Sequence, residues 1–322
     1  MKKGILLINL GTPKSPTAKH LRPYLRRFLG DKRVIATPDV IWKPVLELMI
    51  LPRRPKFSAQ MYKKIWSAEY GSPLAYYTKR QAELLQALVP DTVVKYAFSY
   101  SEPDISQVLA EFEAQKVTEL CIIALYPQYS TTTVGSVSDD VMRFYHKRTY
   151  VPNLKFVTSF YENETYLKLL ADKIKEYWSK KAYDKLIISY HGIPESYVKK
   201  GDPYQAQCEE TTAKLQAMLP DIEILHTYQS KFGPAKWLEP ATDETIKHLP
   251  KQGCKKLLVI SPSFVADCLE TLYELELENR VYFEQAGGEC YDVIPCLNAD
   301  PEFIELLKDL SEAVTQVFKK RS

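Results

Sequence analysis

The chain has 322 residues, of which 45% are hydrophobic and 26% charged, and its formal net charge is +3. These values are ordinary for a globular protein, and a chain of this length corresponds to about two domains. Basic residues are spread along the sequence without a zinc-finger, RNP or Walker pattern, which argues against a nucleic-acid partner. No stretch reaches the roughly 18 apolar residues of a membrane span. The first apolar run is too short for a secretory signal, so we expect a cytoplasmic protein.

Short apolar runs alternate with longer helical patterns along the chain. Strands are predicted at 4–9, 92–98, 119–126, 154–160, 185–191, 222–228, 256–261 and 291–295. Helices are predicted at 78–88, 105–115, 163–178, 208–219 and 301–318. Several strands are apolar on both faces, as buried parallel strands are. This alternation predicts an α/β fold with parallel sheets and right-handed crossovers.

Two pairs of segments resemble each other within the chain. LLINLGTP and LIISYHGIP are apolar strands that end in a Gly-x-Pro turn, and ELCIIALYPQYS and KLLVISPSFVAD both break at a proline followed by an aromatic residue. Two similar halves would produce this pattern. We therefore expect two Rossmann-like domains over 1–150 and 151–300, with a cleft between them. Residues 301–322 are expected to form a helix that packs back on the first domain.

The apolar strand at 185–191 ends in a histidine, His191, just before Gly192 and Pro194. Ligands of open α/β sheets bind outside the carboxyl ends of the strands, where this imidazole would lie. Its ordinary pKa, near 6.5, allows it to accept and donate protons at neutral pH. The alternative is a histidine that stabilises the turn through a backbone hydrogen bond. Position alone leaves both interpretations open.

The stretch DCLETLYELELEN (267–279) has the pattern of a helix, yet it places Glu270, Glu274 and Glu278 at i, i+4 and i+8. Like charges at this spacing repel each other. A divalent cation moving along the row would remove the repulsion, and a π-bulge would aim the carboxylates together. The alternative is a solvated helix face in which Asp267 and Glu270 form a capping box. Capping accounts for only one of the three glutamates.

The segment VIWKPVLELMILPRRPK (40–56) is strongly apolar and then basic. It is either a core helix or a lip that meets a large apolar ligand or a membrane surface, with Arg53 and Arg54 near anionic groups. Tyrosines close to the expected strand ends would line a pocket for a flat ligand or pack in the core: Tyr62, Tyr96, Tyr126 and Tyr129.

Several stretches together resemble the ferrochelatase family. They are SYHGIPESYVKKGDPY, YPQYSTTTVGS, TYQSKFGPAKWLEPATDETI, PSFVADCLETLYELELENR, INLGTP and YGSPLAYYTKRQ. The resemblance runs from about residue 4 to about residue 300, in the family's order, and is strongest to the proteobacterial branch. It implies insertion of Fe²⁺ into protoporphyrin IX, the terminal step of protohaem synthesis, with release of two protons. It also implies two Rossmann-like domains with the porphyrin between them.

The resemblance assigns roles to individual residues. His191 would be the base for the pyrrole protons or a ligand of the entering metal, and Glu270 the essential glutamate across the ring. Glu274 and Glu278 would form an acidic metal path behind Glu270, and segment 40–56 a hydrophobic lip. The residues implied in porphyrin binding are Asn9, Arg53, Arg54, Tyr62, Ser72, Tyr96, Tyr129 and Trp237.

The cysteines bear on cofactors. The chain has six cysteines and no CxxC pair, which favours reduced thiols in a cytosolic protein. Thr131 stands where cluster-containing animal relatives have cysteine, and no cysteine follows Cys296, so we expect no iron–sulfur cluster and no other prosthetic group. The expected partners are porphyrin and ferrous iron as substrates, with peripheral contact to the cytoplasmic membrane. The chain is expected to be a monomer or a homodimer.

Three other functions compete with iron insertion. A related chelatase would insert cobalt or nickel, because metal choice is not legible in the sequence. A non-catalytic haem carrier would have no need of His191 opposite Glu270. A sugar- or nucleotide-binding α/β protein is disfavoured, because neither half has a GxGxxG or GxxxxGK[ST] phosphate loop.

Overall fold

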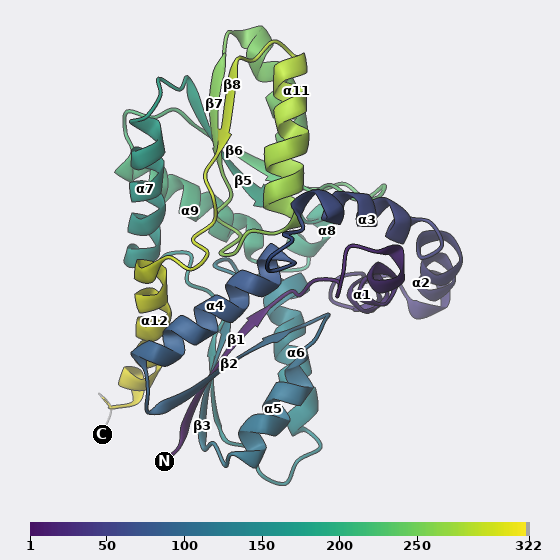
Figure 1. Cartoon of the computed structure of the whole chain (residues 1–322), viewed down its shortest axis with the longest axis vertical. Coiled ribbons are helices and arrows are strands. Elements are labelled where there is room, and N and C mark those ends of the chain that lie inside the picture. The colour runs from purple at the N-terminus through teal and green to yellow at the C-terminus, as the bar shows by residue number, and fades with distance from the viewer. Residues whose placement is uncertain (320–322) are drawn as a thin grey trace. The chain divides into compact units, whose positions relative to one another are not determined.

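The computed structural model describes residues 1–319, with side chains described up to residue 312. The last three residues of the predicted 301–322 segment therefore lie outside the described part. The chain divides into two compact units (Figure 1). Unit 1 contains Met1–Tyr126, Ser130–Ser159 and the chain from Ala299 on, and unit 2 contains Pro127–Tyr129 and Phe160–Asn298.

Unit 1 is built on a four-stranded parallel sheet with the order β2-β1-β3-β4. Its strands are β1 (Lys3–Asn9), β2 (Thr92–Phe98), β3 (Glu119–Ala124) and β4 (Asn153–Val157). The inner strands β1 and β3 are almost wholly buried, which explains their continuous apolar runs. All four carboxyl ends meet at one edge, where polar residues of the following loops gather.

The helices of unit 1 cover both faces of this sheet. They are α1 (Ala18–Gly30), α2 (Asp39–Pro44), η1 (Val45–Ile50), α3 (Arg54–Ile65), α4 (Pro73–Leu88), α5 (Ile105–Ala114), η2 (Thr131–Gly135), α6 (Ser136–Tyr145) and α12 (Pro301–Lys319). The segments η1 and η2 are π-helical. α5 and α6 bury their apolar sides against Leu6, Ile8 and Ile122. Alternate strand residues face opposite sides, so α4 and α12, which pack together, lie against the other face.

The first three helices form a small core of their own, beside the sheet (Figure 1). Its buried members are Tyr24, Leu25, Leu29, Leu46, Leu51 and Tyr100. Trp42 of α2 donates its indole N–H to the Leu29 carbonyl, at 2.6 Å, and so ties α2 to the end of α1. The predicted segment 40–56 is therefore α2, η1 and the start of α3 rather than one helix.

Unit 2 repeats the same strand order, β6-β5-β7-β8, again wholly parallel. Its strands are β5 (Lys185–His191), β6 (Ile224–Gln229), β7 (Lys256–Ile260) and β8 (Cys290–Val293). Its helices are α7 (Glu164–Trp178), α8 (Glu195–Val198), α9 (Tyr204–Met218), α10 (Thr242–His248), η3 (Leu249–Gln252), η4 (Glu270–Glu278) and α11 (Asn279–Gln285).

The two faces of the unit 2 sheet meet different helices. Ile187 and Val259 pack with residues of α10, η4 and α11. His191 shares the Ile187 face, because alternate strand residues point to the same side. Tyr190 points to the other face, where its hydroxyl lies 3.0 Å from that of Thr212 on α9. The fold thus places His191 on the same side of the sheet as η4.

The α/β class, the eight strands and the parallel sheets predicted from the sequence are confirmed. The segment at 267–279 differs from a plain α-helix. Its middle, Glu270–Glu278, is π-helical, so that each N–H bonds to the carbonyl five residues earlier. This is the non-α geometry that the row of like charges suggested.

Candidate active site

His191 is the last residue of β5, and contacts of its backbone N–H and of its ring hold it in place. Its N–H donates to the Ser263 hydroxyl at 3.2 Å, and its Nδ1 lies 2.7 Å from the Gly192 carbonyl. A carbonyl only accepts, so Nδ1 carries the proton in the neutral ring and Nε2 keeps its lone pair. The turn-stabilising and functional interpretations of this histidine are therefore compatible.

The turn after His191 is packed too tightly for a side chain. A Cβ at Gly192 would lie 2.8 Å from the Gln229 carbonyl and 3.2 Å from the Trp237 ring. The Gly192 N–H instead donates to that carbonyl at 2.8 Å. Trp237 also forms a bridge with Pro194. Glycine here brings the ends of β5 and β6 together and sets Trp237 beside the His191 turn.

Gln229 connects the end of the sheet with the π-helix. It is paired with His191 in strand register and is only 3% exposed. Its amide nitrogen donates to the backbone carbonyl of Glu270 at 3.0 Å, and its amide oxygen accepts from Ser189 at 2.8 Å. The neighbour of His191 thus fixes the first residue of η4. In the sequence, TYQSK was identified only as part of a family signature. The two polar residues at the end of the expected strand, Gln229 and Ser230, were a signal that could have indicated this contact.

Glu274 is held by the residue that follows Gln229. The Ser230 N–H and hydroxyl each donate to one carboxylate oxygen of Glu274, both at 2.6 Å. The pKa of Glu274 is raised to about 7, mainly by burial and also by the nearby carboxylates of Glu270 and Glu278, while the two Ser230 bonds oppose the shift. The middle of the glutamate row can therefore hold or release a proton near neutral pH.

The residues before η4 leave Glu270 free of a capping role. The Asp267 carboxylate accepts from the Thr271 hydroxyl at 3.1 Å and from the Asn298 amide at 2.6 Å. The alternative in which Asp267 and Glu270 form a capping box is therefore wrong. Burial and the nearby Glu270 raise the pKa of the Cys268 thiol well above its ordinary value.

Among the described residues, no group of three or more His, Cys, Asp or Glu side chains is arranged to hold a metal ion. Groups that pass an ion onward must bind it weakly enough to release it, so a closed cage is not required of a transfer path. The metal-ligand roles of His191, Glu270, Glu274 and Glu278 stay predictions.

Two predicted porphyrin-binding residues of unit 1 already have hydrogen-bond partners. The Asn9 amide donates to the Thr78 hydroxyl at 3.1 Å, and its oxygen accepts from the backbone at residue 10. Ser72, which precedes α4, donates to the Thr12 hydroxyl at 2.8 Å. Both side chains are 5% exposed. They tie the loop after β1 to α4.

The three predicted tyrosines occupy different environments. Tyr62 is buried on α3, with its ring centre 6.4 Å from that of Trp66. Tyr96 lies within β2 rather than after it and is partly buried. Tyr129 is partly buried, and its backbone N–H donates to the Gln207 side chain at 2.6 Å. Tyr62 and Tyr96 belong to unit 1 and Tyr129 to unit 2, and their roles in porphyrin binding stay predictions.

The lip segment, residues 40–56, has one buried side and one exposed side. Leu46 and Leu51 are buried in the small core. Its exposed large apolar side chains are Val40 (83% exposed), Ile41 (59%), Leu48 (74%) and Met49 (60%). Arg53 and Arg54 follow them and are exposed. The buried side agrees with the core interpretation, whereas contact of the exposed side with a ligand or a membrane stays a prediction.

The ferrochelatase family model matches residues 2–314. The chain belongs to the ferrochelatase family. It is 48% identical to the coproporphyrin III ferrochelatase of Enterococcus faecalis, over 96% of this chain and 98% of that one. It is 49% identical to the coproporphyrin III ferrochelatase of Lactococcus lactis subsp. lactis (96% and 97% covered) and 42% identical to the ferrochelatase of Enterobacter sp. strain 638 (96% and 97%). The protein is thus a metal chelatase that acts on porphyrin.

Solved chelatase structures share the fold at low sequence identity. SirB from Bacillus subtilis matches with a TM-score of 0.59 and 14% identity over 98% of both chains. CbiX, the terminal enzyme of sirohaem biosynthesis in denitrifying bacteria, matches with a TM-score of 0.55 and 14% identity over 97% and 99%. The family's sheet architecture therefore extends to these chelatases. Within the described part of this chain, no helix has the length and apolarity to cross a bilayer.

Proposed function

We propose that this ferrochelatase inserts Fe²⁺ into coproporphyrin III, with protoporphyrin IX as the second candidate. The support is the identity of the relatives, since those at 48–49% are named coproporphyrin III ferrochelatases and those at 42–43% ferrochelatases. Coproporphyrin carries more carboxylates than protoporphyrin, and the exposed Arg53 and Arg54 offer them guanidinium partners. Protoporphyrin IX, the ring expected from the sequence, becomes the alternative.

The arrangement of His191, Gln229 and Glu270 carries the proposed reaction. Metal insertion replaces two pyrrole N–H protons by one Fe²⁺, so the enzyme must accept two protons for each ion delivered. His191 offers Nε2 as the base, and the Gly192 carbonyl holds the opposite ring nitrogen, which supports the imidazolium once it forms. Glu270 supplies a carboxylate from η4, a hard oxygen ligand suited to a divalent ion.

After Glu270, Glu274 is the next residue of η4 that we expect to carry a proton or a metal ion. Its pKa of about 7 lets it take up a proton or share an ion without a large free-energy cost at neutral pH. Glu278 continues the row at the end of η4. The charges of Glu270 and Glu278 both raise the pKa of Glu274, and we expect the three carboxylates to act together as an acidic row.

The substrate is tested by anaerobic turnover. Purified enzyme is mixed with Fe²⁺ and either coproporphyrin III or protoporphyrin IX, and the Soret and visible bands are followed. We expect kcat/KM to be at least about tenfold higher for coproporphyrin III, a difference of about 1.4 kcal/mol in transition-state binding. Faster turnover of protoporphyrin IX would reverse the two candidates. Turnover only with Co²⁺ or Ni²⁺ would overturn iron as the metal.

The catalytic residues are tested by substitution. His191→Ala and Glu270→Gln should each lower kcat by about 10²- to 10⁴-fold, the range for a positioned acid or base. Their circular dichroism spectra should match that of the unmodified enzyme. Ser179→Ala, on the exposed end of α7, is the control that should retain full activity. Near-normal turnover in either site variant would remove that residue from the mechanism.

Further properties stay predictions. These are the absence of an iron–sulfur cluster, a cytoplasmic location, peripheral membrane contact, and a monomeric or homodimeric state. The six cysteines are free thiols in the structure. Iron and sulfide analysis of anaerobically purified enzyme tests the first prediction, cell fractionation the second and third, and sedimentation the fourth.

A further inference from the structure

Unit 1 carries a connection between its first two strands that is much longer than its equivalent in unit 2. The strands β1 and β2 are joined by residues 10–91, whereas β5 and β6, at the same places in the strand order, are joined by residues 192–223. The longer connection holds α1, α2, η1 and α3, which pack around their own small core beside the sheet. This insertion must be tied to the sheet by contacts of its own.

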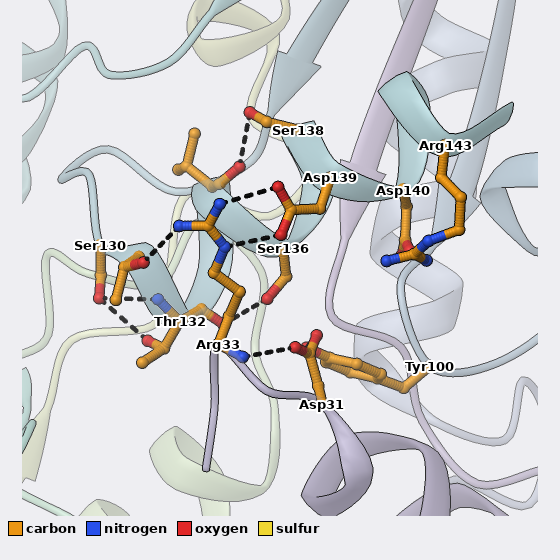
Figure 2. Close-up of polar contacts among 12 residues, drawn as sticks. Asp31, Arg33, Tyr100, Ser130, Thr132, Ser136, Ser138, Asp139, Asp140 and Arg143 are labelled. Carbon is orange, nitrogen blue, oxygen red and sulfur yellow. Dashed lines mark hydrogen bonds and ion pairs between the residues drawn. The ribbon is translucent and has the colours of Figure 1, made fainter. Parts of the chain in front are cut away.

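Arg33, in the loop between α1 and the lip segment, makes such a contact (Figure 2). Its Nε and Nη2 donate to the two carboxylate oxygens of Asp139 on α6, at 2.7 Å and 2.8 Å. Its Nη1 donates to the Thr131 hydroxyl on η2 at 3.0 Å. A two-pronged pairing of this kind fixes orientation as well as distance. The Arg33 guanidinium therefore joins the loop before the lip segment to η2 and α6, which follow β3.

Arg33 passes close to Gly135, the last residue of η2. A Cβ at that position would lie 3.5 Å from both Cδ and Nη1 of Arg33, an ordinary van der Waals distance. It would lie 3.2 Å from the Thr131 hydroxyl, which is tight. A side chain at Gly135 would therefore press on Thr131, the second partner of Arg33, rather than on the guanidinium itself.

The backbone around Arg33 is connected to the small core of the insertion. The Arg33 N–H donates to one oxygen of Asp31 at 2.7 Å, and the Tyr100 hydroxyl donates to the other at 2.7 Å (Figure 2). Burial and Asp31 raise the pKa of Tyr100, so its hydroxyl remains a donor. The Tyr100 ring belongs to the same core as Leu46 and Leu51 of the lip segment. We therefore expect displacement of Arg33 to alter the packing of the lip segment.

The two units differ in how they bind a carboxylate at an equivalent place in the chain, Asp139 in unit 1 and Glu274 in unit 2. Asp139 follows Pro127 by 12 residues, and Glu274 follows Pro262 by the same 12. Both carboxylates come after the third strand of their unit and close to a π-helical segment, η2 or η4. In unit 2, the Glu274 carboxylate accepts hydrogen bonds from the N–H and the hydroxyl of Ser230. No cationic group is among the partners of its described hydrogen bonds. In unit 1 its counterpart is neutralised by Arg33 of the insertion.

We propose that Arg33 is a positioning residue whose ion pair with Asp139 is a latch that holds the lip segment for porphyrin capture. The porphyrin part of this proposal rests on the proposed function. Both side chains of the pair are about two-fifths exposed, at 40% and 42%. Water screens such a pair, so the latch sets the lip's orientation rather than the stability of the fold.

Five variants test the latch: Arg33→Met, Arg33→Lys, Asp139→Asn, the double variant Arg33→Met with Asp139→Asn, and the exchanged pair Arg33→Asp with Asp139→Arg. The control is Arg80→Gln, which removes an exposed ion pair with Glu83 on α4. Hydrogen exchange of the amides in 39–56 is measured without substrate, and KM and kcat for coproporphyrin III with Fe²⁺ are measured separately.

We expect Arg33→Met and Asp139→Asn to speed exchange in 39–56 by about three- to tenfold and to raise KM by a similar factor, the scale of an exposed two-pronged pair. kcat should stay within about twofold, because the latch touches no reacting atom. Combining Arg33→Met with Asp139→Asn should add little, since both remove the same contact. The exchanged pair should restore part of the loss.

Unchanged exchange in both single variants would overturn the latch, and so would fully additive effects in the double variant. Faster exchange with unchanged KM would overturn its role in porphyrin capture. If Arg33→Met does not fold, Arg33→Lys keeps the charge and loses the two-pronged geometry, so it decides the same question. If the unmodified enzyme turns over neither porphyrin, the proposed function fails while the exchange measurement still decides the latch.

Discussion

Ser230 and Glu274 are joined by two hydrogen bonds: the backbone N–H and the hydroxyl of Ser230 each donate to one carboxylate oxygen of Glu274 at 2.6 Å. Ser230 holds this position with a φ of +66°, in the left-handed region. A non-glycine residue there is under strain of about 1 kcal/mol or more. The pairing therefore depends on a backbone shape that few residues adopt.

Ser230→Ala should shift the pH dependence of catalysis. Loss of the hydroxyl removes one of the two bonds that favour the ionised form of Glu274, so the pKa of Glu274 should rise above about 7. If an ionised Glu274 is needed for turnover, the rising limb of the kcat/KM profile should move to higher pH. An unmoved limb would show that Glu274 does not titrate during the reaction. Ser179→Ala serves as the unaffected control.

Ser230→Gly is a matched variant for the backbone. It also lacks the hydroxyl but tolerates positive φ, so it should be more stable than Ser230→Ala by about 1 kcal/mol. Denaturant unfolding of both proteins measures the difference. Equal stability would mean that the turn relaxes when the hydroxyl bond is lost.

Glu274→Gln should stabilise the fold above neutral pH while it impairs catalysis. The folded pKa of Glu274, about 7, lies above the ordinary 4.5, so the stability from holding its proton is complete below pH 4.5 and is lost as pH rises through 7. Glutamine does not titrate and avoids this loss. We expect it to raise the free energy of unfolding at pH 8 by about 1–3 kcal/mol, an estimate from the size of the shift.

The measurement is urea unfolding of both proteins at pH 5 and pH 8, with Glu284→Gln on the exposed surface as control. The advantage of Glu274→Gln should shrink at pH 5. An equal advantage at both pH values would mean that Glu274 does not carry the linkage.

His226 should make the fold sensitive to acid. Its Nδ1 lies 2.8 Å from the Thr212 hydroxyl, and its Nε2 is buried without a hydrogen-bond partner among the described residues. Burial lowers the pKa of His226 below 6.5, although Glu209 opposes this. The unfolded chain then binds the proton more readily, so stability falls as pH drops below 6.5, by at most about 1.4 kcal/mol per pH unit.

His226→Gln should keep a polar group beside Thr212 and remove this acid sensitivity. The slope of unfolding free energy between pH 6.5 and pH 5 should be shallower in the variant than in the unmodified enzyme. The test compares the two slopes, because Glu274 contributes the opposite trend in both proteins. Identical slopes would show that His226 binds its proton equally well in the folded and unfolded chains, so that folding does not lower its pKa.

The exposed side of the lip segment should bind membranes. Leu48→Glu with Met49→Glu removes two exposed apolar side chains, each worth about 1.5–3 kcal/mol when buried. We expect flotation with liposomes of anionic phospholipid to fall by at least about tenfold. Leu88→Glu, on an exposed site outside the lip, should float normally. Equal flotation of all three proteins would exclude the lip as a membrane anchor.

The sequence predicted all eight strands because each is a short, mainly apolar run, and several are apolar on both faces, the pattern that burial on both faces imposes. It also predicted His191 at a strand's carboxyl end, whereas the π-helical geometry of the glutamate row was only considered as a way to aim the carboxylates together. The contacts of Gln229, Ser230 and Arg33 were not predictable. Each depends on strand register or on a partner far along the chain, as with Arg33 and Asp139, and local patterns carry no such information. Tyr100 was missed for the same reason.

The repeated strand order has an evolutionary consequence. Two copies of one four-stranded ancestor would give two sheets with matching orders, each with a π-helical segment after its third strand. Duplication would have freed each copy to specialise. On the proposed function, the second copy would have kept its acidic side chains for the passage of ions and protons. The first would have gained the long connection between its first two strands, whose Arg33 pairs with Asp139.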